Sequence, residues 1–306
     1  MEIVNLLSNK SGLTEEELLK VIINGSNKYK VYSIPKRSHG KRIIAHPSKK
    51  LKNIQKYLLK VINFPNHTSA MAYEKGTSIK KNAIVHSKNQ FLLKMDLAEF
   101  FNSITPEIFW GAFSKHFKVE PTEIDTYLIN NILFWHRDNQ ELVLSVGAPT
   151  SPKISNFCML EFDKIVFDFC QKSYITYTRY ADDMTFSTNI REILFDIPNF
   201  IESLLFYLFG SAISINYSKT VFSSKAHNRH VTGVTITNEG NLSLGRKRKR
   251  YIKHLIYQFT QSKIDKATTF HLKGLIAFAS DIEPSFVISL KSKYGEVVLN
   301  EIMDKK

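Results

Sequence analysis

The chain has 306 residues, of which 43% are hydrophobic and 23% are charged, and its 42 Lys and Arg outnumber 28 Asp and Glu to give a net charge of +14. This composition is typical of a soluble globular protein, and the most apolar stretch, residues 204–215, is too short to span a bilayer. Cys158 and Cys170, the two cysteines, give neither a disulfide framework nor a zinc-site spacing, and the first residues do not form a secretory signal. We therefore expect a cytoplasmic protein without a membrane partner.

The basic excess favours a polyanionic partner, through contacts with phosphates and the release of counterions. Charge alone leaves nucleic acid and an acidic membrane surface as alternatives. Residues 241–306 contain 13 Lys and Arg against six acids, and their most basic part, Arg246–Arg250, is followed by Tyr251 and Tyr257. Basic residues interleaved with aromatic ones are typical of nucleic-acid binding, although a solubilising helix face has the same composition.

Hydrophobic periodicity and turn signals predict an alternation of helices and short strands. Thr14 and Glu17 form a capping box that begins a helix ending at Asn24-Gly25, and a hairpin follows, joined through Ser38-His39-Gly40. The expected strands are residues 29–35, 41–47, 91–96, 174–180, 184–188, 212–217, 220–223 and 230–237. The further expected helices are residues 51–62, a segment beginning near Ala98, 122–136, 152–172, 191–209 and most of the chain beyond 247. This order predicts an α+β fold, with a small antiparallel sheet backed by helices.

Three carboxylates stand out against these elements. Asp96 ends an apolar strand, and the adjacent Asp182 and Asp183 lie in a tight turn between two strands. A pair of acids in a turn is most often simply solvated. Three acids from separate rigid elements would, however, suit divalent cations, because Mg²⁺ prefers hard oxygen ligands and offsets the repulsion between the carboxylates.

The motifs around these acids decide between the two interpretations. Tyr180-Ala-Asp-Asp183 resembles the YxDD box of reverse transcriptases, and Asp96-Leu-Ala-Glu-Phe-Phe101 resembles their first catalytic motif. Gly147-Ala-Pro-Thr-Ser-Pro152, followed by Asn156, is similar to their nucleotide-packing loop and helix. Asn216-Tyr-Ser-Lys-Thr220 is similar to their next palm motif. Because four motifs occur in the family's order, the chain is identified as a member of the reverse transcriptase family.

Two further stretches narrow the resemblance. Asn82-Ala-Ile-Val-His86 matches the NAxxH signature of bacterial retron reverse transcriptases, and Val231-Thr-Gly233 matches their VTG signature. The short length, with neither a maturase nor a nuclease extension expected, agrees with this group. The alternatives are a reverse transcriptase of the group II intron or diversity-generating type, and a non-catalytic RNA-binding scaffold with a polymerase fold.

The resemblance implies a right-hand polymerase acting as an RNA-directed DNA polymerase by a two-metal mechanism. It implies an N-terminal helix and fingers in residues 1–90, a palm in 91–238 with a fingers-type helical insertion at about 103–145, and a basic helical thumb in 239–306. Asp96, Asp182 and Asp183 would hold two Mg²⁺ ions, and Lys219 would approach the pyrophosphate leaving group. A solvated strand lysine is the alternative for Lys219.

Other residues are implied to bind the nucleotide. Phe101 matches the aromatic gate that excludes a ribonucleotide, although a core role is the alternative. Ala148, Pro149 and Ser151 would form the floor under the nucleotide. Lys41 and Arg42 resemble basic fingers residues that clamp a triphosphate, by a looser match that an exposed hairpin would also explain. Val146 stands where many relatives have Gln.

A last group is implied to contact RNA or DNA: Asn82, His86, Thr232, Gly233, Arg246, Lys247, Arg248, Lys249 and Arg250. Asn82 and His86 share a helical face, so a hydrogen-bonded structural turn is their alternative role. The implied partners are dNTPs, a cognate structured non-coding RNA, its RNA–DNA product and a defence effector protein. Synthesis would begin at a 2′-hydroxyl of an internal guanosine and give branched, RNA-linked single-stranded DNA (msDNA), in anti-phage defence.

Overall fold

The computed structural model describes residues 2–35, 40–118, 120–137 and 141–305. The chain forms two compact units. The first contains Met1–Lys75, Met95–Met184 and Phe195–Thr220, and the second contains Gly76–Lys94, Thr185–Leu194 and Val221–Lys306. The division into fingers, palm and thumb at residues 90 and 238 stays a prediction.

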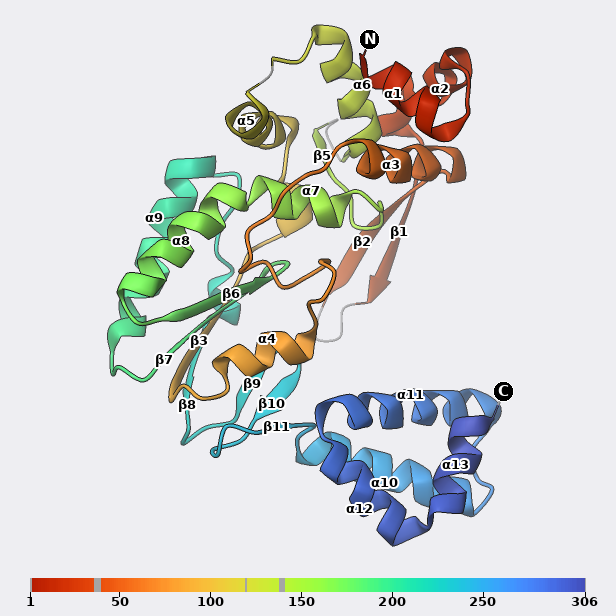
Figure 1. Cartoon of the computed structure of the whole chain (residues 1–306), viewed down its shortest axis with the longest axis vertical. Coiled ribbons are helices and arrows are strands. Elements are labelled where there is room, and N and C mark those ends of the chain that lie inside the picture. The colour runs from red at the N-terminus through yellow and green to blue at the C-terminus, as the bar shows by residue number, and fades with distance from the viewer. Residues whose placement is uncertain (1, 36–39, 119, 138–140, 306) are drawn as a thin grey trace. The chain divides into compact units, whose positions relative to one another are not determined.

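The first unit begins with helices that flank a hairpin (Figure 1). The predicted capping box at Thr14 is present, because the Glu17 amide donates to Thr14 Oγ1 at 3.2 Å and the Thr14 amide donates to Glu17 Oε2 at 2.9 Å. The hairpin pairs Tyr29 with Pro47 and Pro35 with Lys41, as expected, whereas its predicted link through Ser38 and His39 lies outside the described residues. These elements are α1 (Glu2–Ser11), α2 (Glu15–Ile22), η1 (Gly25–Asn27), β1 (Tyr29–Pro35), β2 (Lys41–Pro47) and α3 (Lys49–Val61).

Two predicted helices of this unit are wrong in extent. The helix expected over 122–136 ends at Leu133, because the buried Phe134 and Trp135 pair with Leu144 and Val143 in a short hairpin. The helix expected over 152–172 is two helices that meet at Met159, which has φ −87° and ψ 3°. Apolar spacing continues across both breaks, so periodicity did not reveal them. The elements are α6 (Glu123–Leu133), β4 (Phe134–His136), β5 (Leu142–Leu144), α7 (Ser151–Cys158) and α8 (Leu160–Lys172).

Two other expected helices begin differently. The helix expected near Ala98 is preceded by the short 3₁₀ helix η2 (Phe100–Ser103), and α5 (Pro106–Phe117) starts at its proline. The helix expected over 191–209 consists of η4 (Ile193–Asp196) and α9 (Ile197–Phe209). Helix α8 packs against α9, and the two lie side by side in Figure 1.

A four-stranded sheet in the order β6-β7-β3-β8 carries the predicted acids. Its strands are β3 (Phe91–Asp96), β6 (Thr176–Tyr180), β7 (Asp183–Thr188) and β8 (Val221–Ser224). The strand expected over 212–217 is wrong, since only an isolated bridge between Ile215 and Leu97 forms there, followed by the 3₁₀ helix η5 (Tyr217–Lys219).

The second unit joins a short sheet to a helical bundle, whose helices α10–α13 are blue in Figure 1. The strand expected over 230–237 is a tight hairpin, because Val231 pairs with Val234 and the two residues between them have φ 46° and 80°. The buried core of this unit includes Val231, Ile252, Leu272, Leu290 and Ile302. Its elements are α4 (Ile79–His86), β9 (Arg229–Val231), β10 (Val234–Ile236), β11 (Leu242–Ser243), α10 (Arg246–Thr260), α11 (Lys266–Ile282), α12 (Pro284–Tyr294) and α13 (Glu296–Asp304).

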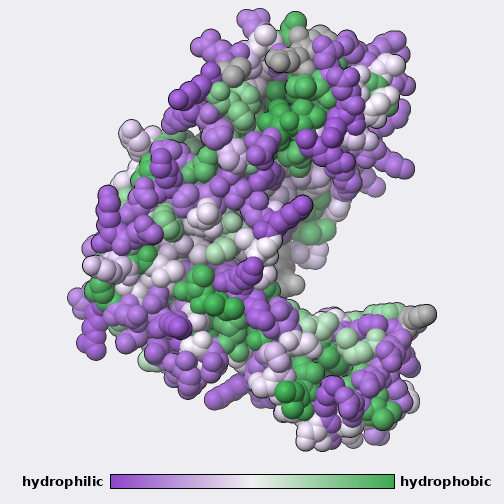
Figure 2. All heavy atoms as spheres, viewed as in Figure 1, coloured by the Kyte–Doolittle hydropathy of each residue, from purple (hydrophilic) through white to green (hydrophobic). Residues whose placement is uncertain are grey.

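The surface and the helices agree with the composition of a globular protein. Hydrophilic residues cover most of the face drawn in Figure 2. Among the described residues, no helix combines the length and the apolar character that crossing a membrane requires.

Candidate active site

Asp96 and Asp182 are brought together by the backbone of the first unit. Asp96 is the last residue of β3, and its side chain is buried. Asp182 lies in the turn between β6 and β7, where Ala181 adopts φ 59°. The Leu97 amide donates to the Asp182 carbonyl at 3.0 Å, so the residue after one acid is hydrogen-bonded to the other.

Lys219 and Asn216 complete this group. The Asn216 amide donates to the Asp96 carbonyl at 2.7 Å, and Asn216 Nδ2 donates to Asp96 Oδ1 at 3.1 Å. The 3₁₀ turn that follows positions Lys219, whose Nζ lies 2.8 Å from each carboxylate oxygen of Asp96. Lys219 thus forms an ion pair with Asp96, while its predicted approach to the pyrophosphate leaving group stays a prediction.

The charges of these groups influence one another. Burial raises the pKa of Asp182, and the charge of Asp96 raises it further, while Lys219 and Arg42 oppose the rise. Partial desolvation lowers the pKa of Lys219, but the hydrogen bond and charge of Asp96 outweigh it and leave this pKa raised. Closely placed carboxylates that disfavour one another's charge are the arrangement that a cation would stabilise.

Asp183 differs from the other two acids. It begins β7 and is exposed, and its charge acts on Lys219. Within the part of the chain that the structure describes, no group of three His, Cys, Asp or Glu side chains is placed closely enough to hold a metal ion. The carboxylates of Asp96 and Asp182 fit Mg²⁺ in their chemistry, since carboxylate oxygens are hard ligands.

A buried ion pair under the turn was not predicted from the sequence. Arg179 Nη2 lies 2.6 Å from Asp163 Oδ2 of α8, and both side chains are fully buried. Tyr177 Oη donates to Asp163 Oδ1 at 2.8 Å, and Arg179 Nη1 donates to the Ala181 carbonyl at 2.8 Å. The pair therefore fixes the residue just before Asp182. An arginine inside a strand that otherwise consists of threonine and tyrosine was the available signal.

The predicted nucleotide residues Phe101, Arg42 and Lys41 have different environments. The Phe101 ring lies 5.6 Å from that of Phe100 and 6.4 Å from that of Tyr73. Arg42 is exposed on β2, and its charge acts on Asp182 and Tyr73. Lys41 is also exposed on β2.

The predicted nucleotide floor is a loop held against β2. The Val146 carbonyl accepts from the Ala45 amide at 3.1 Å, and the Ala148 amide donates to Ser145 Oγ at 3.1 Å. Ala148 and Ser151 are buried, and Pro149 is half-buried. Because Val146 makes this contact through its backbone, the loop's attachment does not depend on the side chain at that position.

The residues predicted to contact RNA or DNA fall into two groups in the second unit. Asn82 and His86 are fully buried, and His86 Nδ1 lies 2.7 Å from Ser187 Oγ, so their environment is that of structural residues. Burial lowers the pKa of His86 to about 3, which keeps it neutral. Thr232 and Gly233 form the hairpin tip, where Thr232 Oγ1 donates to the Ile79 carbonyl at 3.3 Å.

The basic run 246–250 begins α10, and its residues also fall into two groups, those exposed to solvent and those with partners inside the protein. Arg246, Lys247 and Arg250 are exposed. Arg248 lies 5.0 Å from the Phe278 ring and donates to the Gly233 carbonyl at 3.3 Å, while Lys249 pairs with Glu283. Three of the five cations are thus available to a partner.

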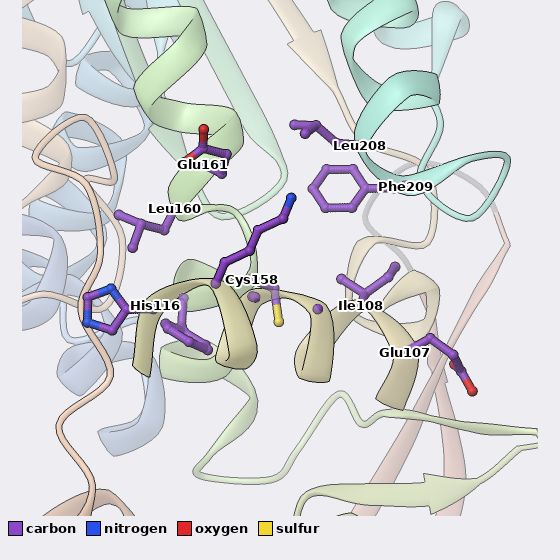
Figure 3. A pocket seen from close by; sticks show the side chains of 12 residues that line it. Glu107, Ile108, His116, Cys158, Leu160, Glu161, Leu208 and Phe209 are labelled. Atoms are coloured by element: carbon purple, nitrogen blue, oxygen red, sulfur yellow. The ribbon is translucent and has the colours of Figure 1, made fainter. Parts of the chain in front are cut away.

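A cavity of about 340 Å³ opens elsewhere in the first unit, between α5, α7, α8 and α9 (Figure 3). Ile108, Leu160, Leu208 and Phe209 line it together with Glu107 and Glu161. None of the predicted site residues borders it, and the buried Cys158 at its wall has a pKa raised by burial.

Comparison with known proteins identifies the class to which this site belongs. Residues 34–236 match the family model described as "Reverse transcriptase (RNA-dependent DNA polymerase)". The matched range contains Asp96, the turn at Asp182 and Lys219. The chain therefore belongs to the reverse transcriptases and is an RNA-directed DNA polymerase.

Curated relatives place it within this family. The chain is 47% identical over 279 residues to the retron Ec83 reverse transcriptase of Escherichia coli, covering 90% of this chain and 89% of the relative. It is 31% identical to the retron Ec73 reverse transcriptase of the same organism, covering 97% and 96%. The chain is thus a reverse transcriptase of the bacterial retron group. Among solved structures, apo telomerase from Candida tropicalis has a TM-score of 0.49 at 11% identity, over 92% of this chain and 61% of that one.

Proposed function

We propose that this chain copies its own structured non-coding RNA into single-stranded DNA that stays linked to the RNA (msDNA), with Asp96 and Asp182 at the point of chemistry. The observation that carries the proposal is the junction of β3 with the β6–β7 turn, where the Leu97 amide binds the Asp182 carbonyl. This junction holds one carboxylate at a strand end and another in a turn, beside one lysine. Synthesis starts at a guanosine 2′-hydroxyl of the RNA and serves anti-phage defence, in the cytoplasm, beside an effector protein.

Asp96, Asp182 and Asp183 would hold two Mg²⁺ ions. These would supply activation of the primer hydroxyl and stabilisation of charge during in-line attack on the α-phosphate. The chain's own contribution is to fix the acids through buried backbone hydrogen bonds, so that little rearrangement is needed when charge develops. Lys219 is protonated because its pKa is raised, and its ammonium can neutralise the departing pyrophosphate.

The substrate would enter beside the same strands. Phe101 excludes a ribonucleotide 2′-hydroxyl, and Ala148, Pro149 and Ser151 form the surface under the nucleotide. Arg42, whose charge reaches Asp182, attracts the triphosphate, with Lys41 beside it on β2. Arg246, Lys247 and Arg250 hold the duplex by its phosphates, without reading its sequence.

The test is DNA synthesis on a primed RNA template with dNTPs and Mg²⁺. The double variant Asp182→Asn plus Asp183→Asn keeps the size of both side chains and removes their charge, so synthesis should fall at least about 10³-fold, because electrostatic stabilisation dominates phosphoryl transfer. The matched control is Asp168→Asn plus Asp304→Asn, which removes two exposed carboxylates. Equal DNA synthesis by the site variant and the control would contradict the two-metal assignment and place the chemistry at residues other than Asp182 and Asp183.

A further inference from the structure

Tyr73 of the first unit is exposed and has a strained backbone. Its φ is 65°, in the left-handed region, where a bulky side chain costs about 1–2 kcal/mol. Its side chain is 51% exposed, so the ring contributes little to the core that would offset this cost. A residue held in such a conformation without a packing role is a candidate for a functional one.

The residues on both sides of Tyr73 are anchored. The Met71 amide donates to the Arg179 carbonyl at 2.7 Å, which attaches the segment to β6. Asn156 Nδ2 of α7 donates to the Ala72 carbonyl at 2.9 Å. The next residue, Glu74, forms an ion pair with Lys153 of α7, with 3.0 Å between Nζ and each carboxylate oxygen. The anchors leave Tyr73 no freedom to relax into an ordinary conformation.

The same anchors connect Tyr73 to the candidate active site. Lys153 and Asn156 belong to α7, whose first residue is Ser151, and Ser151 was predicted to form the nucleotide floor together with Ala148 and Pro149. The Arg179 carbonyl accepts the hydrogen bond from the Met71 amide, and the Arg179 side chain donates to the Ala181 carbonyl beside Asp182. The position of Tyr73 is therefore set by the elements that position the acids and the floor.

The ring itself lies at the site. Its centroid is 6.4 Å from that of Phe101, with the two planes inclined by 54°. Partial burial raises the pKa of its phenol, and the charges of Asp182 and Tyr180 raise it further, while Arg42 opposes the rise. Tyr73 is thus within electrostatic reach of a catalytic carboxylate and of the cation predicted to attract the triphosphate.

We propose that Tyr73 is a nucleotide-binding residue, whose ring forms with Phe101 an aromatic pair that packs against the sugar and base of the incoming deoxyribonucleoside triphosphate. Lys153, Glu74 and Asn156 are its positioning residues, because they hold the segment around it without touching the substrate. The inference rests on the proposed function, since it places the substrate of that site. Aromatic rings bind any of the four bases, which suits a polymerase that must accept each in turn.

The experiment measures nucleotide affinity separately from chemistry. A primed RNA template whose primer ends in a 2′,3′-dideoxynucleotide binds the next dNTP but forms no bond, so the Kd for dNTP can be titrated on this complex. Tyr73→Gly removes the ring and relieves the left-handed strain. It should raise the dNTP Kd about tenfold, a typical effect of losing one stacked ring. Tyr73→Phe keeps the ring and should stay within about twofold of wild type.

Three controls make the result specific. Tyr207→Ala removes a tyrosine of α9 that is 81% exposed and should leave the dNTP Kd unchanged. The affinity of Tyr73→Gly for the primed template should be unchanged, and its melting temperature should not fall. Glu74→Gln should raise the dNTP Kd while keeping template affinity, with Glu74→Asp recovering part of the loss.

Two results would overturn the proposal. One is a dNTP Kd for Tyr73→Gly within twofold of wild type. The other is a parallel loss of template affinity, which would place the ring against the duplex. Failure of the proposed function would give a different result. Wild type would then make no DNA on an extendable primer, whether or not it bound dNTP on the terminated primer.

Discussion

At the scale of single residues, the ion pair between Asp163 and Arg179 supports the turn that carries Asp182, at a high cost in desolvation. Both side chains are fully buried, so neither charge is solvated by water and each depends on the other for its stabilisation. Replacing Asp163 by Asn leaves the guanidinium without its counter-charge. We expect Asp163→Asn to lower the free energy of unfolding by about 3–5 kcal/mol, measured by urea denaturation.

Stability and activity should separate when both charges are removed. Asp163→Leu plus Arg179→Met replaces the pair by apolar side chains, which restores most of the stability in comparable buried pairs. This double variant also loses the hydrogen bond that Arg179 donates to the Ala181 carbonyl. Its DNA synthesis should therefore stay below that of wild type even where its stability is recovered. A double variant with full activity would show that the pair has no part in holding the turn.

His86 makes stability depend on pH. Its pKa is lowered to about 3 in the folded protein because the ring is buried, whereas an unfolded histidine titrates near its usual value of about 6.5. Below pH 6.5 the unfolded chain therefore binds one more proton than the folded chain. The stability that the neutral ring provides is present above pH 6.5 and is lost as the pH falls toward 3, by about 1.4 kcal/mol per pH unit.

The corresponding measurement is urea denaturation at pH 7 and pH 5 for wild type and His86→Gln. Wild type should lose about 2 kcal/mol more than the variant over this interval, because glutamine does not titrate. Equal losses would mean that the ring takes up a proton in the folded protein, and the buried, neutral role would then be wrong.

At the scale of elements, the attachment of the Gly147 loop to β2 depends on the absence of a side chain. Gly147 has φ 136°, and an added Cβ would lie 2.9 Å from the Ala45 carbonyl oxygen, a backbone atom that cannot easily move. Gly147→Ala should therefore displace the loop that leads into α7. The free energy of unfolding should fall by about 1–3 kcal/mol, and the KM for dNTP should rise. Thermal unfolding and steady-state kinetics measure the two effects.

Gly111→Ala is the matched control for this prediction. Gly111 lies in α5 with an ordinary helical backbone, and an added Cβ there meets no atom within 4 Å. Alanine should stabilise the helix by up to about 1 kcal/mol and leave the KM unchanged. If both variants behaved alike, the close approach between Gly147 and β2 would not determine the loop's position.

The elements also show what the sequence can predict. The strands observed as β3 and β7 were predicted over residues 91–96 and 184–188, because these stretches are short and bounded by turns and because their motifs are local. The hairpin tip at Thr232 was missed, since a β-branched residue at φ 46° lies outside ordinary turn preferences. The break at Met159 was missed because apolar spacing continues through it.

The site was predictable to the same degree. The motifs selected Asp96, Asp182 and Lys219, which the structure brings together, and their catalytic roles stay predictions. The pair Asp163 and Arg179 was not selected, because nothing local links a helix residue to a strand residue 16 positions later. Tyr73 was missed for the same reason, since its significance comes from its neighbours in space. The burial of Asn82 and His86 could not be read from a helical face that is polar in sequence.

At the scale of the whole molecule, the charge of +14 predicts how binding responds to salt. Each phosphate contact releases counterions, so the slope of log affinity against log salt concentration counts the contacts. In the basic run 246–250, Arg248 and Lys249 have partners within the second unit, whereas Arg246, Lys247 and Arg250 are exposed. The slope of log affinity against log salt concentration should therefore depend more on Arg246, Lys247 and Arg250 than on Arg248 and Lys249.

Changing Arg246, Lys247 and Arg250 together to Gln should weaken binding to any RNA–DNA duplex and reduce the magnitude of the slope by about 2–3. The control variant changes Lys10, Lys164 and Lys172 to Gln, exposed lysines of α1 and α8, and so alters the net charge by the same amount. Titrations at several salt concentrations distinguish a local contact from a general effect of charge. A similar loss in both variants would mean that only the overall field attracts the duplex. A loss confined to the cognate RNA would mean that α10 recognises one folded RNA rather than phosphates in general.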